Sequence, residues 1–310
     1  MKNYYRILLG RKSAFAEEAF RDGFIGAGWF GDTDLTNELT EDWRKFNHVF
    51  IPKYLAENPT KTKIAAGLAC GMLHTITKGI AEGDMVLCPD GKGSYRVGEV
   101  IGGYEYHPGH KLAHRRPVRW LERLISREEM SQSLRNSAGS IATVSTLTKY
   151  AEEIEILIGG SPSVAGALAA EIIEDASAFA LEKHLEDFLV QNWSLTELGK
   201  NYDIYEEEGE PVGQQYPSDT GPLDILAISK DKKELLVVEL KKGRASDAVV
   251  GQIQRYMGYV KDELAEPGQA VRGVIIAFED DTRVRRALSV AQSIEFYTYS
   301  IQFNLNKVIL

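Results

Sequence analysis

The runs "PLDILAI" (residues 222–228) and "ELLVVELK" (residues 234–241) decide the fold of the C-terminal half. Short apolar runs bounded by polar turn residues predict strands, and the short polar segment between these two predicts a hairpin. The second run ends in Glu239, Leu240 and Lys241. A carboxylate and an ammonium at the end of a buried strand cost free energy unless something uses them.

The hairpin sets the distance between two acids. A loop centred between Asp231 and Lys232 places Asp224 directly across from Glu239, whereas an odd-length loop would shift this register by one residue. Facing carboxylates about 5 Å apart repel by roughly 3 kcal/mol at an effective dielectric constant of ~20, more than the ~0.2–1 kcal/mol of an ordinary cross-strand pair. Lys241, on the same face as Glu239, offsets part of this repulsion, and a divalent metal such as Mg²⁺ would offset more.

The alternative is a purely structural, salt-bridged strand end with no catalytic role. Two neighbouring segments favour a functional site instead. A helix predicted from about residue 247 carries Gln252 and Tyr256 four residues apart, and hence on one face. Upstream, the amphipathic stretch "LEKHLEDFLVQNW" (residues 181–193) carries Glu186, a helical carboxylate that could reach the same place.

The order of elements in this half predicts an α/β, more specifically α+β, sandwich. A helix at about 177–191 and a weak strand near 202 precede the hairpin, and the helix from about 247 leads into "VRGVIIAF" (271–278). That run is continuously apolar, as expected of a strand covered on both faces. A further helix and strand follow, so the predicted core order is αβββαβ.

Together these residues resemble the PD-(D/E)XK nuclease superfamily, and within it the C-terminal nuclease domain of the NucS type. The resemblance covers roughly residues 177–305. One departure is that Leu223 precedes the aspartate, with Pro222 one place earlier. The residues that carry the resemblance are Glu186, Asp224, Glu239, Lys241, Gln252 and Tyr256.

The resemblance implies a metal-dependent phosphodiesterase site. Asp224, Glu239 and the Leu240 carbonyl would hold Mg²⁺ or Mn²⁺, and Glu186 would complete the shell directly or through water. Lys241 would orient the attacking water or help to deprotonate it, and the Gln–Tyr pair of the following helix would position the DNA backbone. Such a metal activates water and stabilises charge on the scissile phosphate.

The N-terminal half alternates short strands with turn signals, such as the Asp90–Gly91 pair of a predicted hairpin. We therefore predict a mixed β domain over residues 1–124. Residues 125–176, rich in Ser and Gly, predict a helical linker to a nuclease domain at 177–310.

The glycine- and aromatic-rich "GFIGAGWFGDTDL" (residues 23–35) and "HRRPVRW" (114–120) resemble PUA-like and EVE-like modules that bind modified bases in restriction systems. The resemblance implies that Trp29 stacks on a flipped base, while a core position is an equally common role for a tryptophan. His114 is better explained as a structural histidine. The candidate phosphate contacts are Arg115, Arg116 and Arg119.

Composition narrows the class of protein. The 310 residues are 44% apolar and 26% charged, as in soluble globular proteins, and the net charge of −9 argues against a protein that coats nucleic acid non-specifically. A local basic stretch between Lys111 and Arg127 could still meet phosphates. No run spans a bilayer and no signal-peptide pattern occurs, which predicts a cytoplasmic protein. Cys70 and Cys88 lack the spacing of a zinc site.

The sequence therefore predicts a Mg²⁺-dependent DNA endonuclease, most simply a modification-dependent restriction enzyme that acts in defence. One alternative is a NucS-like repair nuclease on mismatched or branched DNA. Another is a non-catalytic nucleic-acid-binding protein. DNA, with or without a modified base, is the predicted partner, and a homodimer is an open alternative because cutting both strands needs two sites.

Overall fold

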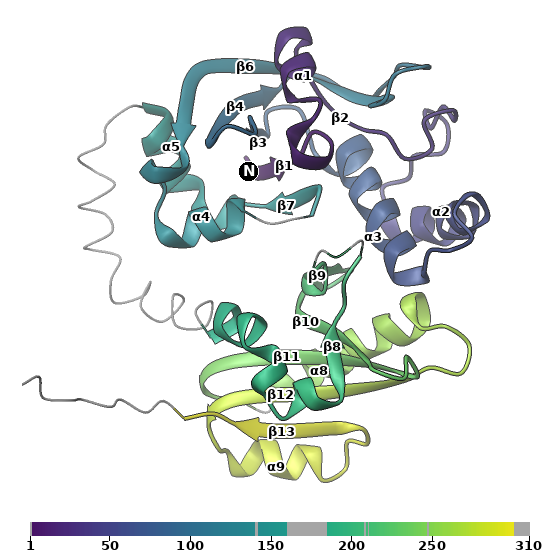
Figure 1. Cartoon of the computed structure of the whole chain (residues 1–310), viewed down its shortest axis with the longest axis vertical. Helices are drawn as coiled ribbons and strands as arrows, with labels where there is room; N and C mark the ends of the chain where they lie inside the picture. Colours follow the sequence, from purple (N-terminus) through teal and green to yellow (C-terminus); the bar gives the residue numbers. More distant parts are fainter. Residues whose placement is uncertain are drawn as a thin grey trace, which may run out of the picture. The chain divides into compact units, whose positions relative to one another are not determined.

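The chain forms two compact units, Met1–Ser177 and Ala178–Leu310 (Figure 1). The computed structural model describes residues 2–139, 142–159, 185–207, 209, 211–246 and 248–300. Each unit has its own sheet and its own buried core. Both mix helices with strands, which confirms the predicted α+β class.

The first unit is built on a seven-stranded sheet in the order β2-β6-β4-β3-β1-β7, with β5 paired to β6. β1 and β3 are parallel, and the other pairs are antiparallel. The predicted hairpin at Asp90–Gly91 joins β3 to β4, with Gly91 at a φ of 75°. The strands are β1 (Tyr4–Ile7), β2 (Phe24–Ala27), β3 (Met85–Pro89), β4 (Ser94–Val100), β5 (Glu105–Tyr106), β6 (His114–Ser126) and β7 (Val144–Thr146).

The helices of this unit bury their apolar sides against the sheet. Asp42 caps the N-terminus of α2, where its carboxylate accepts hydrogen bonds from two backbone N–H groups, and the Thr62 hydroxyl caps α3 by accepting one from the Ala65 N–H. α3 is rich in Ala and Gly and almost wholly buried. The helices are α1 (Ala16–Asp22), α2 (Trp43–Glu57), α3 (Lys63–His74), α4 (Gln132–Ala138) and α5 (Ala151–Gly159).

The segment predicted to be a helical linker belongs, in its described part, to the first unit. β7 pairs with β1 at the edge of the sheet. α4 and α5 place Leu134 and Ile154 in a buried cluster with Leu87 and Val97 of the sheet. Burial of these apolar side chains holds the segment on the unit instead of leaving it as a connector. Residues 160–176 of the predicted linker lie outside the described residues.

The second unit has a six-stranded sheet in the order β13-β12-β11-β10-β8, with β9 paired to β10. β11, β12 and β13 are parallel to one another, and β10 pairs antiparallel with β8, β9 and β11. Residues 185–191 are helical. The other elements are β8 (Tyr202–Ile204), β9 (Gln214–Ser218), β10 (Gly221–Ser229), β11 (Glu234–Arg244), α8 (Ala248–Tyr259), β12 (Ala270–Glu279), α9 (Thr282–Leu288) and β13 (Ile294–Thr298).

Both faces of this sheet are covered. On one face Leu236, Val238 and Leu240 of β11 are buried in a cluster with Trp193, against which Leu189 of the helical segment packs. Because side chains alternate along a strand, the odd-numbered residues of β11 face the other way. α8 provides the crossover between the parallel strands β11 and β12.

Among the described residues, none of the helices combines the length and the apolar composition needed to cross a bilayer.

Candidate active site

The predicted hairpin register is confirmed. β10 and β11 pair antiparallel with Ile225 facing Val238, so one step further along the hairpin Asp224 lies opposite Glu239. Lys232 closes the turn in the left-handed region, at a φ of 61°. The hairpin thus keeps the predicted register without the Asn-Gly or Asp-Gly pair that such turns favour.

Asp224 reaches the backbone of the neighbouring strand. Its Oδ2 accepts a hydrogen bond from the Leu240 N–H at 2.8 Å. The N–H and C=O of one extended residue point to the same side, so the Leu240 carbonyl also lies on the edge of β11 that faces β10. One carboxylate and one backbone carbonyl therefore lie at the same strand end.

Glu239 and Lys241 form an ion pair on the same side of β11. Lys241 Nζ lies 2.6 Å from Glu239 Oε1. The Glu239 side chain is 2% exposed, whereas that of Lys241 is 29% exposed. The pair is compatible with a salt-bridged strand end, so the chemistry of the site depends on what else faces these two residues.

α8 covers the face of the sheet that carries Glu239 and Lys241. Gly273 of β12 pairs with Val237 of β11, and a Cβ added to Gly273 would lie 2.6 Å from Sδ of Met257 on α8. The glycine therefore permits close packing of α8 on the odd-numbered face of β11.

The structure brings Gln252 and Tyr256 together on α8. Gln252 Nε2 donates to the Tyr256 hydroxyl at 3.4 Å. That hydroxyl lies 3.4 Å from the position of a Cβ on Gly221, at the start of β10. The pair thus lies on the covered face, next to the strand that carries Asp224.

Glu186 is held by two amides. Its side chain is buried, and its two oxygens accept hydrogen bonds from Gln214 Nε2 at 2.6 Å and from Gln215 Nε2 at 2.7 Å. Gln215 Nε2 also donates to Asp224 Oδ1 at 3.2 Å. Because carboxylates only accept, the nitrogen end of each amide must face them. One amide nitrogen therefore bridges Glu186 and Asp224.

The two glutamines were missed by the sequence analysis. β9 pairs with β10 so that Tyr216 faces Leu223, and one step further Gln215 lies opposite Asp224. The turn signal "SDTG" (residues 218–221) between the strands could have predicted this hairpin and its register. Gln215 adopts a φ of 51°, which nothing in the sequence indicates.

The chemistry of these side chains fits a hard divalent cation. Three carboxylates and one backbone carbonyl supply only oxygen ligands, the set that Mg²⁺ prefers. Within the described ranges, however, no three His, Cys, Asp or Glu side chains are already arranged to hold a metal. The amide of Gln215 lies between two of the carboxylates. Binding of a cation by both acids therefore requires this amide to move.

In the first unit, Trp29 lines a pocket of ≈340 Å³. Phe30 and Tyr54 add two aromatic rings, and Asp32 and Glu57 make part of its wall acidic. Trp29 is half-buried and packs against the core, and its role in stacking on a base stays a prediction. A pocket with this lining suits a flat ligand that donates hydrogen bonds.

His114 supports the loop that forms this pocket. It is fully buried, with Nε2 at 3.1 Å from the Phe30 carbonyl and Nδ1 at 2.8 Å from the Tyr104 hydroxyl. Burial lowers the pKa of His114. A neutral ring that donates to Phe30 and accepts from Tyr104 satisfies both contacts, so the histidine is structural.

Two of the three predicted phosphate contacts are buried inside the first unit. Arg115 is buried, stacks on Phe24 and pairs with Glu18 at 3.0 Å. Arg116 is also buried and donates to the Ile80 carbonyl. Consecutive strand residues point to opposite faces, and the guanidinium of each is held inside the unit on its own side of β6, by Glu18 for Arg115 and by the Ile80 carbonyl for Arg116.

Arg119 is the exposed member of the set. Its side chain is 65% exposed and forms an ion pair with Glu99. Exposed pairs of this kind contribute little to stability. A role in phosphate binding therefore stays a prediction for Arg119 alone.

Two family models match the chain. Residues 181–304 match the model described as "Endonuclease NucS C-terminal domain". The second unit carries a NucS-type nuclease domain. Residues 5–148 match "Domain of unknown function (DUF8426)", so the resemblance of the first unit to PUA-like modules stays a prediction.

Proteins named endonuclease NucS match different shares of the chain. Endonuclease NucS of Methanocaldococcus jannaschii is 25% identical over 263 residues, which cover 84% of this chain and 86% of the relative. Endonuclease NucS of Pyrococcus furiosus is 22% identical over 64% of this chain and 61% of the relative. In Corynebacterium glutamicum, endonuclease NucS is 35% identical over 32% of this chain and 37% of the relative.

A solved structure, a repair endonuclease from Pyrococcus abyssi, matches with a TM-score of 0.31 and 22% identity. The match covers 38% of this chain and 46% of that one. At this TM-score it adds nothing to the assignment, which rests on the NucS-type family model.

Proposed function

We propose that this chain is a metal-dependent DNA endonuclease that acts on mismatched or branched DNA. The observation that supports it is the gathering of Glu186, Asp224 and the Glu239–Lys241 pair around the end of one hairpin in a NucS-type domain. The names of the relatives support a repair nuclease more than a restriction enzyme.

The acids and the Leu240 carbonyl are the proposed cation ligands. Asp224 and Glu239 would hold Mg²⁺ or Mn²⁺ with that carbonyl, and Glu186 would complete the site once the Gln215 amide gives way. When bound, such an ion activates a water molecule and neutralises charge on the scissile phosphate. The affinity of the site for this ion is expected to depend on all three carboxylates, because each makes the local electrostatic potential more negative.

Lys241 and the α8 pair would act on the substrate. Lys241 keeps part of its side chain in contact with solvent while it holds Glu239, so its ammonium can orient an attacking water or take part in its deprotonation. Gln252 and Tyr256 offer an amide and a hydroxyl on the same covered face, where they would position the DNA backbone.

The test is cleavage of matched, mismatched and branched duplexes with and without Mg²⁺. We expect Mg²⁺-dependent cutting of the mismatched or branched DNA, and a loss of at least about 100-fold in Glu239→Gln. Glu234→Gln is the matched control, because Glu234 lies at the other end of β11 and bonds to Tyr202. Equal cutting by wild type and Glu239→Gln would refute the site, and no cutting by wild type would favour a non-catalytic binding protein.

A second candidate function is cleavage that depends on a modified base. The pocket at Trp29 favours it, because an aromatic pocket with acidic walls can accept a flipped base that carries amino groups. Cutting of duplexes that differ only in base modification tests it. Equal cleavage rates on both duplexes, with the rates of Trp29→Ala unchanged, would reject this function.

We also propose a homodimer for double-strand cutting, which sedimentation analysis would test.

A further inference from the structure

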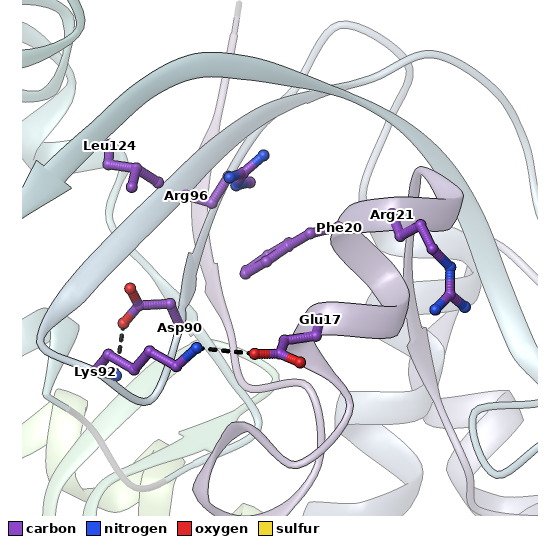
Figure 2. Close-up of a pocket in the computed structure, with 7 residues that line it drawn as sticks. All are labelled: Glu17, Phe20, Arg21, Asp90, Lys92, Arg96 and Leu124. Atoms are coloured by element: carbon purple, nitrogen blue, oxygen red, sulfur yellow. Dashed lines mark hydrogen bonds and ion pairs between the residues drawn. The ribbon is translucent and has the colours of Figure 1, made fainter.

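The first unit contains a second pocket, of ≈360 Å³, for which neither candidate function has a use (Figure 2). It lies between α1 and the strands β4 and β6, and its size is at the lower end of the ~300–1,000 Å³ of small-ligand sites. It is lined by Glu17, Phe20, Arg21, Asp90, Lys92, Arg96 and Leu124.

Arg96 is the unusual member of this pocket. Its guanidinium lies over the ring of Phe20, 5.1 Å from the ring centroid, and Figure 2 shows the two side by side. Its Nε is buried without a hydrogen-bond partner. No described residue forms an ion pair with it, in contrast to Arg115, Arg119 and Arg123 of the same unit. An arginine that borders a cavity without a carboxylate partner is suited to bind an anion bidentately.

Two apolar side chains, Phe20 and Leu124, flank Arg96 in the pocket. Leu124 faces Arg96 directly in the β4–β6 ladder and is 39% exposed. Phe20 is fixed by an edge-to-face contact with Trp120 at 4.9 Å, and the indole N–H of Trp120 donates to the Ala19 carbonyl. The anion that fits here therefore has a flat or apolar part beside its charge.

The two acids of the pocket are already engaged. Glu17 pairs with Lys92 at 2.8 Å, and both side chains are exposed, so an incoming anion can take over the ammonium at little cost. Asp90 Oδ1 accepts from the backbone N–H groups of Lys92 and Ser94, which turns it into the β3–β4 loop. Arg96 and Lys92 thus give the cavity its positive charge.

We propose that this pocket binds a phosphodiester group of a DNA strand. Arg96, with Lys92, holds the phosphate, and the adjoining sugar or base rests on Phe20 and Leu124. The proposal rests on the proposed function only in taking DNA as the ligand, since it needs neither metal nor cleavage. It assigns to Arg96 the contact that the buried Arg115 and Arg116 cannot make.

The test is fluorescence anisotropy of a labelled single-stranded DNA oligonucleotide with the full chain in EDTA. We expect Arg96→Gln to weaken binding about tenfold and to reduce the slope of log affinity against log salt by about one, as for the loss of one phosphate contact. Arg96→Lys should recover part of the affinity. Lys2→Gln, which removes an exposed cation of the same unit outside the pocket, should stay within about twofold of wild type.

A second pair of variants guards against misfolding of Arg96→Gln. Leu124→Glu gives Arg96 a carboxylate directly across the ladder and should weaken binding to a similar extent, whereas Leu124→Gln, which removes only the apolar contact, should weaken it less and leave the salt slope unchanged. Wild-type affinity and salt slope in both Arg96→Gln and Leu124→Glu would overturn the proposal, as would no binding by wild type. Displacement by a mononucleotide at an equal concentration of phosphate groups would also overturn it, in favour of a nucleotide site. Because EDTA prevents cleavage, none of these outcomes depends on whether the enzyme cuts.

Discussion

The two units use charged side chains in opposite ways. In the first, Arg115 and Arg116 are buried and their guanidinium groups are consumed by Glu18 and by backbone carbonyls. In the second, carboxylates gather around one hairpin end, where amides and one ammonium hold them together. The difference teaches that the partners of a charged group, more than its position on a strand, decide whether it is available to a ligand.

The largest expected effect concerns a buried arginine. Arg115→Ala should lower the free energy of unfolding of the first unit by about 3 kcal/mol, because it leaves the Leu112 carbonyl and Glu18 without their partner. Urea unfolding measures this. Arg119→Ala should cost no more than about 1 kcal/mol. Equal losses of unfolding free energy in the two variants would contradict the claim that the buried arginine contributes more to stability than the exposed one.

The next effect concerns the amide that bridges two acids. Gln215→Ala should destabilise the metal-free chain by about 2 kcal/mol, because two carboxylates lose a shared donor. Mg²⁺ should recover part of that loss, since a cation can replace the amide. The matched control is Gln214→Ala, which removes a donor from Glu186 but leaves the bridge to Asp224 in place. Thermal unfolding with and without Mg²⁺ measures this recovery. An equal increase in stability of both variants on addition of Mg²⁺ would contradict this account.

A smaller effect concerns pH. Burial lowers the pKa of His114 and of His74 in the folded chain. Below about pH 6.5 the unfolded chain therefore binds more protons than the folded one, so stability is full above that pH and falls as the pH drops toward the folded pKa values. Unfolding compared at about pH 7.5 and pH 5.5 should show this loss, and His114→Gln should reduce it. An unchanged pH dependence in the variant would contradict the assignment.

The candidate active site was largely predictable because its parts are local. Strand alternation places Glu239 and Lys241 on one face, and the length of one loop places Asp224 opposite Glu239. Gln215 follows the same logic one hairpin earlier, but its left-handed backbone and its position between two acids depend on tertiary packing.

The arginines of β6 could not be assigned from the sequence for the same physical reason. The partner of Arg115 is Glu18 on α1, and the partner of Arg116 is the Ile80 carbonyl, both distant in the chain. Sequence patterns report which residues share a strand face, but not which element covers that face. Arg96 lies within a plain strand pattern, which does not reveal that it borders a pocket without an ion pair to any described residue.

The most direct test of the central claim is binding of Mn²⁺ to the full chain, followed by electron paramagnetic resonance. If Asp224 and its neighbouring acids share a divalent ion, wild type should bind Mn²⁺ and Asp224→Asn should bind it at least about tenfold more weakly, while Glu234→Gln on the same hairpin should match wild type. Equal Mn²⁺ affinity in wild type and Asp224→Asn would contradict the account.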